Sequence, residues 1–480
     1  MVNSPPYITG HVDIYLQFGL ECDAIRKIIF LLSGEYMQKK IDHEITRYYS
    51  RTINSKSLQD RASNYLPGGS TRDAQYFDPY PIFANHGEGH YLFDVDNNKY
   101  LDFVINATSL ILGHSHPEII TSLQKQVELG TAFSAPIEKL IDYSELLCKR
   151  IPSIDTLRFT NSGTEATLLA IRAARAYTKK SKIAKFEGGY HGTHESVVIS
   201  VNPQLENLSE TEYNPVQGYE SQPTNILEDV VLLPYNNLDV CETILRSHKD
   251  NLSCVIIEPI VSAFGYTPLN LNFLEGIRQI TKDLDILLIF DEVQSLRISS
   301  GGAQEYFGVI PDLTAMGKII GGGMPVGAFG GHRDIMSIFD QSEGKSYIPH
   351  SGTFNGNPMT LAAGLVTMNH LTPEVYAQLN NLGEILRQKL RSVFAEFEIP
   401  TVISGIGSFF GIHFRDNEIT DYRSTFDSNK SMRRLLFLSL INSGILLQSQ
   451  AAGSLNLLST ELEIDILVNT TRDILERIKY

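Results

Sequence analysis

The segment FTNSGTEA (159–166) places small and hydroxyl-bearing residues at the start of a predicted helix. Ser162, Gly163 and Thr164 would there offer backbone N–H groups and hydroxyls to an anion, which the helix dipole also favours. An ordinary helix N-cap accounts for the same residues, because serine and threonine are good caps. Taken alone, the segment leaves phosphate binding and simple capping both open.

An acidic pair, Asp291-Glu292, follows the apolar run 286–290. Open α/β sheets build their sites outside the carboxyl ends of their strands, where this pair is expected to lie. A turn at the strand end or a metal-binding carboxylate would look the same. Nucleotide hydrolases also carry such acids, but no GxxxxGK[ST] segment accompanies the pair here.

Lys318 lies among small and apolar residues in MGKIIGGGMP (316–325). Removal from water lowers the pKa of a lysine ammonium and favours the free amine that a Schiff base requires. A solvated surface lysine is the alternative. A further segment, HSGTFNGNP (350–358), is by itself no more than a polar loop before a helix.

The combination of these segments indicates a cofactor. Pyridoxal 5′-phosphate (PLP) needs a cup for its phosphate, a carboxylate for its pyridinium nitrogen and a lysine for its aldehyde. All three occur here in that order, each at a predicted boundary between a strand and a loop. The sequence therefore predicts a PLP enzyme with Lys318 as the Schiff-base residue.

Composition places these motifs in a globular protein. Hydrophobic residues make up 42% and charged residues 20% of the 480 residues, a balance typical of folded domains. The formal net charge of −15 argues against a nucleic-acid binder, which needs a basic face. Cys22, Cys148, Cys241 and Cys254 form no CxxC pair, so we expect neither a disulfide framework nor a metal cluster. We find no membrane span and no signal-peptide core, and expect a cytoplasmic protein.

The hydrophobic pattern divides the chain into four parts. Residues 1–58 are predicted as a mostly helical extension, and 59–117 as the first part of a small domain with short alternating strands. Helical stretches alternate with unbroken apolar runs across 118–355, which predicts a large α/β domain around a mostly parallel sheet. Residues 356–480 are predicted to complete the small α+β domain.

Taken together, the motifs resemble a known family. NSGTEA, FEGGYHG (186–192), IFDEV, GKIIGGGMPVGAFGG (317–331) and SGTFNGNP are similar to segments of class III, fold-type I aminotransferases, in a likeness that runs from about residue 60 to 475. Two branches are most similar in the glycine-rich run after the lysine. They are the glutamate-1-semialdehyde 2,1-aminomutases and the β-amino-acid (β-phenylalanine-type) aminotransferases.

The resemblance implies roles for the residues around the cofactor ring. The segment 162–164 would hold the phosphate, and Tyr190 would stack on the pyridine ring with His191 beside it. Asp291 would pair with the pyridinium nitrogen and keep it protonated, while Val293 would pack on the other ring face.

The same resemblance assigns the lysine and implies a partner subunit. Lys318 would carry the cofactor and, once displaced by substrate, act as the base that moves the proton. Thr353 would reach the phosphate of the neighbouring subunit's cofactor. That role implies an obligate homodimer with sites at the subunit interface.

The substrate side is predicted from fewer residues. The LPGGSTR segment resembles the β-amino-acid branch, in which the arginine matching Arg72 holds a substrate carboxylate; a surface ion pair with Asp73 or Asp78 is the alternative. That branch carries a second arginine where this chain has Gln450, which is expected to contact substrate without a charge. A glutamate of the aminomutase branch has no counterpart in this region. DEVQSLR replaces its DEVMTGFR, and Arg297 is interpreted as structural or as an edge of the site.

These observations predict a PLP-dependent aminotransferase that moves an amino group between a β-amino acid, or β-keto acyl compound, and a keto-acid acceptor by a ping-pong mechanism. An intramolecular aminomutase of the glutamate-1-semialdehyde type is the alternative. An inactive PLP-fold scaffold is the alternative from another class, against which the intact Lys318 and Asp291 argue. Residues 1–58 would pack on the dimer as an arm or dock an acyl carrier protein or synthase.

Overall fold

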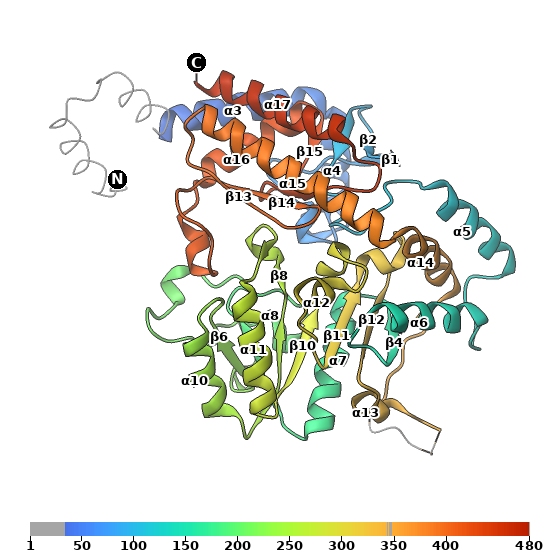
Figure 1. Cartoon of the computed structure of the whole chain (residues 1–480). Coiled ribbons are helices and arrows are strands. Elements are labelled where there is room, and N and C mark those ends of the chain that lie inside the picture. Colours follow the sequence, from blue (N-terminus) through green and yellow to red (C-terminus); the bar gives the residue numbers. More distant parts are fainter. Residues whose placement is uncertain (1–33, 343, 345–347, 480) are drawn as a thin grey trace.

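A seven-stranded sheet forms the centre of the large domain in the computed structural model, which describes residues 34–342, 344 and 348–479 (Figure 1). β12 pairs antiparallel with both of its neighbours, and the other pairs are parallel. In spatial order the strands are β4 (Thr156–Thr160), β12 (Gly327–Gly331), β11 (Leu313–Gly317), β10 (Leu287–Asp291), β7 (Leu252–Ile257), β5 (Lys182–Phe186) and β6 (Val230–Leu233).

Helices cover both faces of this sheet, because its strands are apolar on both sides. Along β7, Val255 and Ile257 belong to a cluster with residues of α10 (Leu238–His248) and α11 (Leu271–Asp283). The alternate residues Cys254 and Ile256 pack with α7 (Gly163–Thr178) on the opposite face. Continuous burial of this kind is what a parallel sheet between two helix layers requires, and it confirms the α/β class predicted from the sequence.

The small domain joins segments from the two ends of the described chain and lies above the sheet in Figure 1. β15 runs parallel to β3 at the edge of one sheet, and a second sheet has three antiparallel strands. The first sheet contains β1 (Ala84–Glu88), β2 (Tyr91–Asp94), β3 (Lys99–Asp102) and β15 (Ile445–Leu446); the second contains β13 (Val402–Ser404), β14 (Phe409–His413) and β16 (Ala452–Ser454).

Further helices and one short ribbon connect or cover these sheets. They are α3 (Gly34–Arg51), α4 (Ile53–Ala62), α5 (Pro117–Leu129), α6 (Glu138–Arg150), α8 (Glu195–Val198), α9 (Thr224–Leu227), α12 (Gly302–Phe307), α13 (Arg333–Met336), α14 (Pro358–His370), α15 (Pro373–Glu396), α16 (Lys430–Asn442), α17 (Glu461–Lys479) and the pair β8 (Ile260–Val261) and β9 (Thr267–Pro268). Within residues 34–342 and 348–479, none of the helices has the length and apolar character that a membrane crossing requires.

The described part of the predicted N-terminal extension packs on the small domain through one face of α3. α3 buries Met37, Ile41 and Tyr48 and packs along α16. The Tyr48 hydroxyl donates to the backbone oxygen of Tyr80 at 2.9 Å, and the Asn442 side chain donates to Glu44 at 2.7 Å. These contacts make α3 a structural helix of this domain. Residues 1–33 of the predicted extension lie outside the described residues.

Candidate active site

A pocket of about 420 Å³ lies at the carboxyl ends of the central strands, where the small-domain loops meet the sheet. This is the edge at which open α/β sheets form their sites. Nine of the residues singled out from the sequence line it: Arg72, Ser162, Gly163, Thr164, Tyr190, His191, Asp291, Val293 and Lys318.

The start of α7, directly after β4, forms one wall of the pocket. Ser162 is the N-cap, and its Oγ accepts from the backbone N–H of Glu165 at 3.2 Å. The predicted capping role is therefore real. The remaining first N–H groups of a helix have no partner within the helix, which leaves them available to an anion. A Cβ on Gly163 would lie 2.9 Å from Val293 Cγ2, so the close fit at this wall requires glycine.

Asp291 ends β10 and faces His191. His191 Nδ1 lies 2.9 Å from Asp291 Oδ2, and the backbone N–H of Val293 donates to Asp291 Oδ1 at 3.1 Å. Burial raises the pKa of Asp291 to about 7 and lowers the pKa of His191 to about 3, so the imidazole is neutral. A cation placed nearby would lower the pKa of this carboxyl group and favour its ionised form. His191 Nε2 is buried and has no hydrogen-bond partner among the described residues.

Lys318 follows β11 and begins a short helical turn, Lys318–Gly321, with a φ of 52°. Its Nζ donates to the backbone oxygen of Ala107 at 2.9 Å. Desolvation lowers the pKa of Lys318 to about 8, and the charges of Asp291 and Glu258 oppose that shift. A lysine with this pKa supplies free amine near neutral pH, as a nucleophilic lysine must.

Several other pocket residues carry polar groups that the sequence pattern did not indicate, among them Glu258 and Gln294. Glu258, after β7, accepts from the backbone N–H of Tyr190 at 3.1 Å and from Ser262 Oγ at 2.6 Å, and burial raises its pKa. Gln294 accepts from Thr108 Oγ1 at 2.7 Å. Glu258 directly follows the wholly buried strand β7, and Asp291 ends β10, so a position at the end of an apolar strand was the available signal.

Arg72 lines the pocket from a loop of the small domain. Its Nη1 donates to Asn106 Oδ1 at 3.1 Å, and it forms no ion pair within the described chain. The alternative of a surface ion pair is therefore not what the structure has; Asp78 instead pairs with Arg434.

Two predicted residues do not reach this pocket. Gln450 is exposed in the turn between β15 and β16, next to Gln448, whose side chain donates to the Tyr266 hydroxyl at 2.6 Å. Thr353 is exposed in a turn before α14. Neither is among the residues that line the pocket.

Arg297 is a buried structural residue. Its guanidinium donates to Ser408 Oγ at 3.1 Å, to the backbone oxygen of Thr108 at 2.9 Å and to Ser454 Oγ at 3.1 Å. These acceptors are neutral, and desolvation lowers the pKa of Arg297 to about 10. Arg297 thus joins the strand-end segment after β10 to the small domain.

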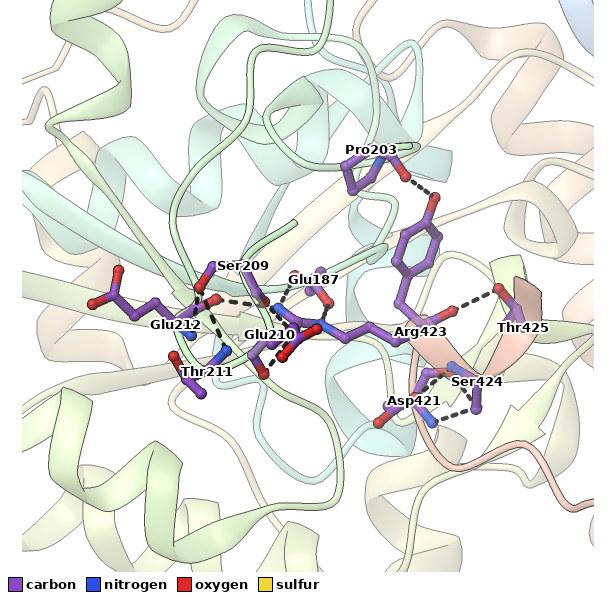
Figure 2. A network of polar contacts seen from close by, with 11 residues as sticks. Glu187, Pro203, Ser209, Glu210, Thr211, Glu212, Asp421, Arg423, Ser424 and Thr425 are labelled. Atoms are coloured by element: carbon purple, nitrogen blue, oxygen red, sulfur yellow. Dashed lines mark hydrogen bonds and ion pairs between the residues drawn. The ribbon is translucent and has the colours of Figure 1, made fainter. Parts of the chain in front are cut away.

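A second arginine joins the two domains next to the end of β5. Figure 2 shows Arg423, from the segment between β14 and α16, reaching the buried Glu187 that follows β5. Its Nε and Nη2 donate to the two carboxylate oxygens at 2.8 and 3.0 Å, and Nη1 donates to the backbone oxygen of Ser209 at 2.6 Å. Beside it, Tyr422 packs so closely on Gly188 that a Cβ there would lie 2.2 Å from its ring. These contacts hold the turn that leads to Tyr190.

The pocket fits PLP by the chemistry of its groups. It combines a helix N-terminus for a phosphate, an acid whose pKa burial has raised, an amine whose pKa burial has lowered, and the exposed ring of Tyr190. The buried Nε2 of His191, which has no hydrogen-bond partner in the described part of the chain, adds a polar atom available to a ligand. A simple polar cleft would not need this set.

Comparison with known proteins gives the same result. The family profile "Aminotransferase class-III" matches residues 73–460. A curated relative, glutamate-1-semialdehyde 2,1-aminomutase of Methanosphaera stadtmanae, is 38% identical over 392 residues, covering 82% of this chain and 90% of the relative.

Solved structures are similar over nearly the whole chain. An ω-transaminase from Sphaerobacter thermophilus has a TM-score of 0.84 at 40% identity, covering 89% of this chain and 98% of that one. A β-phenylalanine aminotransferase from Variovorax paradoxus also has a TM-score of 0.84, at 32% identity, covering 92% and 98%.

Proposed function

The chain belongs to the class-III aminotransferase family, and from this premise we propose that it transfers amino groups to and from a small substrate whose carboxylate binds Arg72. It is a fold-type I enzyme that uses PLP. The bound cofactor supplies an aldehyde for the amine and a ring that withdraws electrons from the carbon that loses its proton.

The chain's own residues would bind the cofactor and orient its ring. The start of α7 at 162–164 would hold the phosphate, with the helix dipole adding to the attraction. Asp291, oriented by His191 and by the Val293 N–H, would place a negative charge against a protonated ring nitrogen. That pairing would bring the pKa of Asp291 back down, since an opposite charge favours the carboxylate.

Lys318 would serve both as the attachment point and as the proton carrier. Its lowered pKa leaves a fraction of neutral amine near pH 7, and its Nζ lies within hydrogen-bond distance of a loop carbonyl in the pocket. The amine would accept the proton from the amino-bearing carbon of the substrate and deliver it to the carbon that receives the nitrogen.

The position and hydrogen-bond partner of Arg72 are the observation that supports the proposed substrate class. Its guanidinium lies on the pocket wall with one neutral partner, Asn106, and no carboxylate within the described chain. A guanidinium in this state suits bidentate recognition of an incoming carboxylate. β-Amino acids, or the matching β-keto compounds, carry that group one carbon away from the reacting centre and are the substrates we propose first.

Similarity to the Methanosphaera stadtmanae aminomutase favours a second candidate, transfer within one molecule. The two reactions differ in their need for a separate acceptor. The test follows the visible absorption of the bound cofactor after 3-aminobutanoate alone. Loss of that absorption with release of the keto product, followed by its return when pyruvate or 2-oxoglutarate is added and converted to alanine or glutamate, supports intermolecular transfer. Conversion of glutamate-1-semialdehyde without any acceptor supports the aminomutase.

We further propose that the active unit is a homodimer. Large apolar side chains are exposed along α5, α6 and the segment between them, where a partner would cover them: Ile120, Val127, Leu129, Phe133 and Ile141. Thr353, exposed and away from its own pocket, would then reach the partner's phosphate site. Light scattering gives the mass, and Ile141→Asp together with Val127→Asp would yield monomers that bind PLP weakly.

For docking of an acyl carrier protein we propose residues 1–33, because α3 uses its apolar face to pack on the small domain. A pull-down with acyl carrier proteins compares the full chain with a chain beginning at residue 34. Equal capture by both would remove the proposal.

A further inference from the structure

Four consecutive residues at the pocket wall adopt left-handed backbone conformations. Ile105, Asn106, Ala107 and Thr108 have φ angles of 39°, 49°, 53° and 75°, and none is glycine. A left-handed conformation costs residues such as Ile105, Ala107 and Thr108 roughly 1–2 kcal/mol each, whereas asparagine adopts it more readily. Strain of this size persists where surrounding contacts hold the backbone in place, and it is found mainly at functional sites.

Three successive residues of this turn contact three different pocket groups. Asn106 Oδ1 accepts from Arg72 at 3.1 Å, and the Ala107 backbone oxygen accepts from Lys318 Nζ at 2.9 Å. Thr108 Oγ1 donates to Gln294 at 2.7 Å. The turn therefore links the proposed carboxylate-binding arginine to the reactive lysine through adjacent residues.

Hydrogen bonds fix both the start and the end of the turn. Asp102 Oδ1 accepts from the backbone N–H groups of Val104 and Ile105 at 2.8 and 2.9 Å, and the Ile105 side chain is fully buried. The backbone oxygen of Thr108 accepts from the buried guanidinium of Arg297 at 2.9 Å. A turn fixed at both ends keeps its side chains at a set position relative to Lys318.

The orientation of the Asn106 amide follows from its neighbours. A guanidinium only donates hydrogen bonds, so the oxygen of the amide must face Arg72. The nitrogen donates to Ser109 Oγ at 3.1 Å, whose own hydrogen goes to the Asn106 backbone oxygen at 2.9 Å. The amide thus presents a neutral acceptor that orients the guanidinium without cancelling its charge, and asparagine is among the residues that tolerate this backbone region.

We propose that Asn106 is a specificity-determining residue that orients Arg72 for the substrate carboxylate, and that the turn 105–108 selects substrates by the separation between carboxylate and amino-bearing carbon. This inference rests on the proposed function, because it takes Arg72 as the carboxylate site. An aspartate at position 106 would pair with Arg72 and compete with the substrate. An alanine would leave the guanidinium free to turn away.

The test measures binding of butanoate, an unreactive carboxylate, to the holoenzyme by calorimetry. Arg72→Ala is expected to weaken binding at least about 10-fold and Asn106→Ala about 3- to 10-fold, as expected for loss of one or two charge-assisted hydrogen bonds. Asn106→Asp should weaken binding more than Asn106→Ala. The double variant Arg72→Ala/Asn106→Ala should equal Arg72→Ala, since Asn106 acts through the arginine.

A matched control separates this role from backbone strain. Asn97 is an exposed asparagine with a φ of 63° in the turn between β2 and β3, so Asn97→Ala makes the same change in the same conformation away from the pocket. It should leave butanoate binding unchanged. In kinetics, Asn106→Ala should raise KM for 3-aminobutanoate and leave KM for sec-butylamine, which lacks the carboxylate, within about twofold.

The possible outcomes are distinguishable. Unchanged butanoate binding in Arg72→Ala would overturn the proposed carboxylate site itself. Weakened binding in Arg72→Ala with wild-type binding in Asn106→Ala would overturn the role of Asn106 and leave the proposed function standing. Additive losses in the double variant would also overturn it, because Asn106 would then act independently of the arginine. Should Asn106→Ala fold poorly, Asn106→Asp carries the same comparison with a nearly isosteric side chain.

Discussion

The cofactor end and the substrate end of the pocket are built from different kinds of structure. Asp291 and Lys318 come directly from the ends of adjacent parallel strands, β10 and β11, in the middle of the sheet. Arg72 and the turn 105–108 come from loops that precede the large domain in sequence, and Arg72 is exposed. Rigid strands suit chemistry that is the same for every substrate, whereas loops can change with the substrate.

Two arginines connect the small domain to the large domain near these ends of the pocket, and they do so through different contacts. Arg297 reaches only neutral oxygens in the described structure and lies over the Phe409 ring at 5.1 Å. Arg423 forms a bidentate ion pair with Glu187. The first anchors the substrate-end turn, and the second anchors the turn that carries Tyr190. The domain contact therefore positions both ends of the pocket.

The largest expected effect lies at the cofactor end. Lys318→Ala should lower the rate of amino transfer at least about 10³-fold, because proton transfer by a positioned base alone contributes 10²- to 10⁴-fold. The visible absorption of the holoenzyme should change at the same time, since covalent attachment is lost. A variant that kept both its spectrum and its rate would show that another residue holds the cofactor.

Asp291→Asn comes next, with an expected loss of about 10²-fold in kcat, the scale for removing one preorganised charge partner. The cofactor-free protein gives an independent measurement. The pKa of Asp291 is raised to about 7 in the folded state, so the folded protein keeps a proton that the unfolded chain releases near pH 4. Asp291 alone should therefore lower the free energy of unfolding by on the order of a few kcal/mol as the pH rises from 4 to 7, whereas His191, whose pKa is lowered to about 3, contributes in the opposite direction.

Urea unfolding at pH 4.5 and 7.5 checks that sign. The free energy of unfolding at pH 7.5 minus that at pH 4.5 should be more negative in the wild type than in Asp291→Asn, because asparagine does not titrate. Equal slopes in the two proteins would mean that Asp291 is ionised in the folded state without its cofactor.

The same contrast between the ends explains what the sequence could predict. Ser162–Thr164, Asp291 and Lys318 each follow an apolar run, and strand ends of a parallel sheet meet at one edge, so the pattern predicted their meeting. Asn106 offered no such signal: its role depends on a left-handed turn and on a contact with Arg72, 34 residues away in the chain. The partners of Arg297 and Arg423 come from distant segments of the small domain, which local patterns do not place.

A smaller effect is expected at the Arg423 contact. Arg423→Met leaves Glu187, whose side chain is 3% exposed, without its partner, and should lower the free energy of unfolding by about 3 kcal/mol. Adding Glu187→Gln should recover part of that loss. Arg434→Met removes an exposed ion pair with Asp78 and serves as the control, with an expected loss below about 1 kcal/mol. Equal losses in the two arginine variants would mean that the Glu187 contact does not stabilise the domain arrangement.

The smallest effect is expected at Gln450, and it tests how far the substrate end extends. The residue is exposed in its turn and does not line the pocket, so Gln450→Ala should change KM for 3-aminobutanoate less than about twofold, as at surface positions away from the site. Arg72→Ala, measured beside it, should raise KM about 10-fold. A rise of similar size in Gln450→Ala would mean that the turn between β15 and β16 moves onto the bound substrate. The substrate end would then consist of two loops that close on the ligand, and the fixed cofactor end would face a wall that forms only when substrate is present.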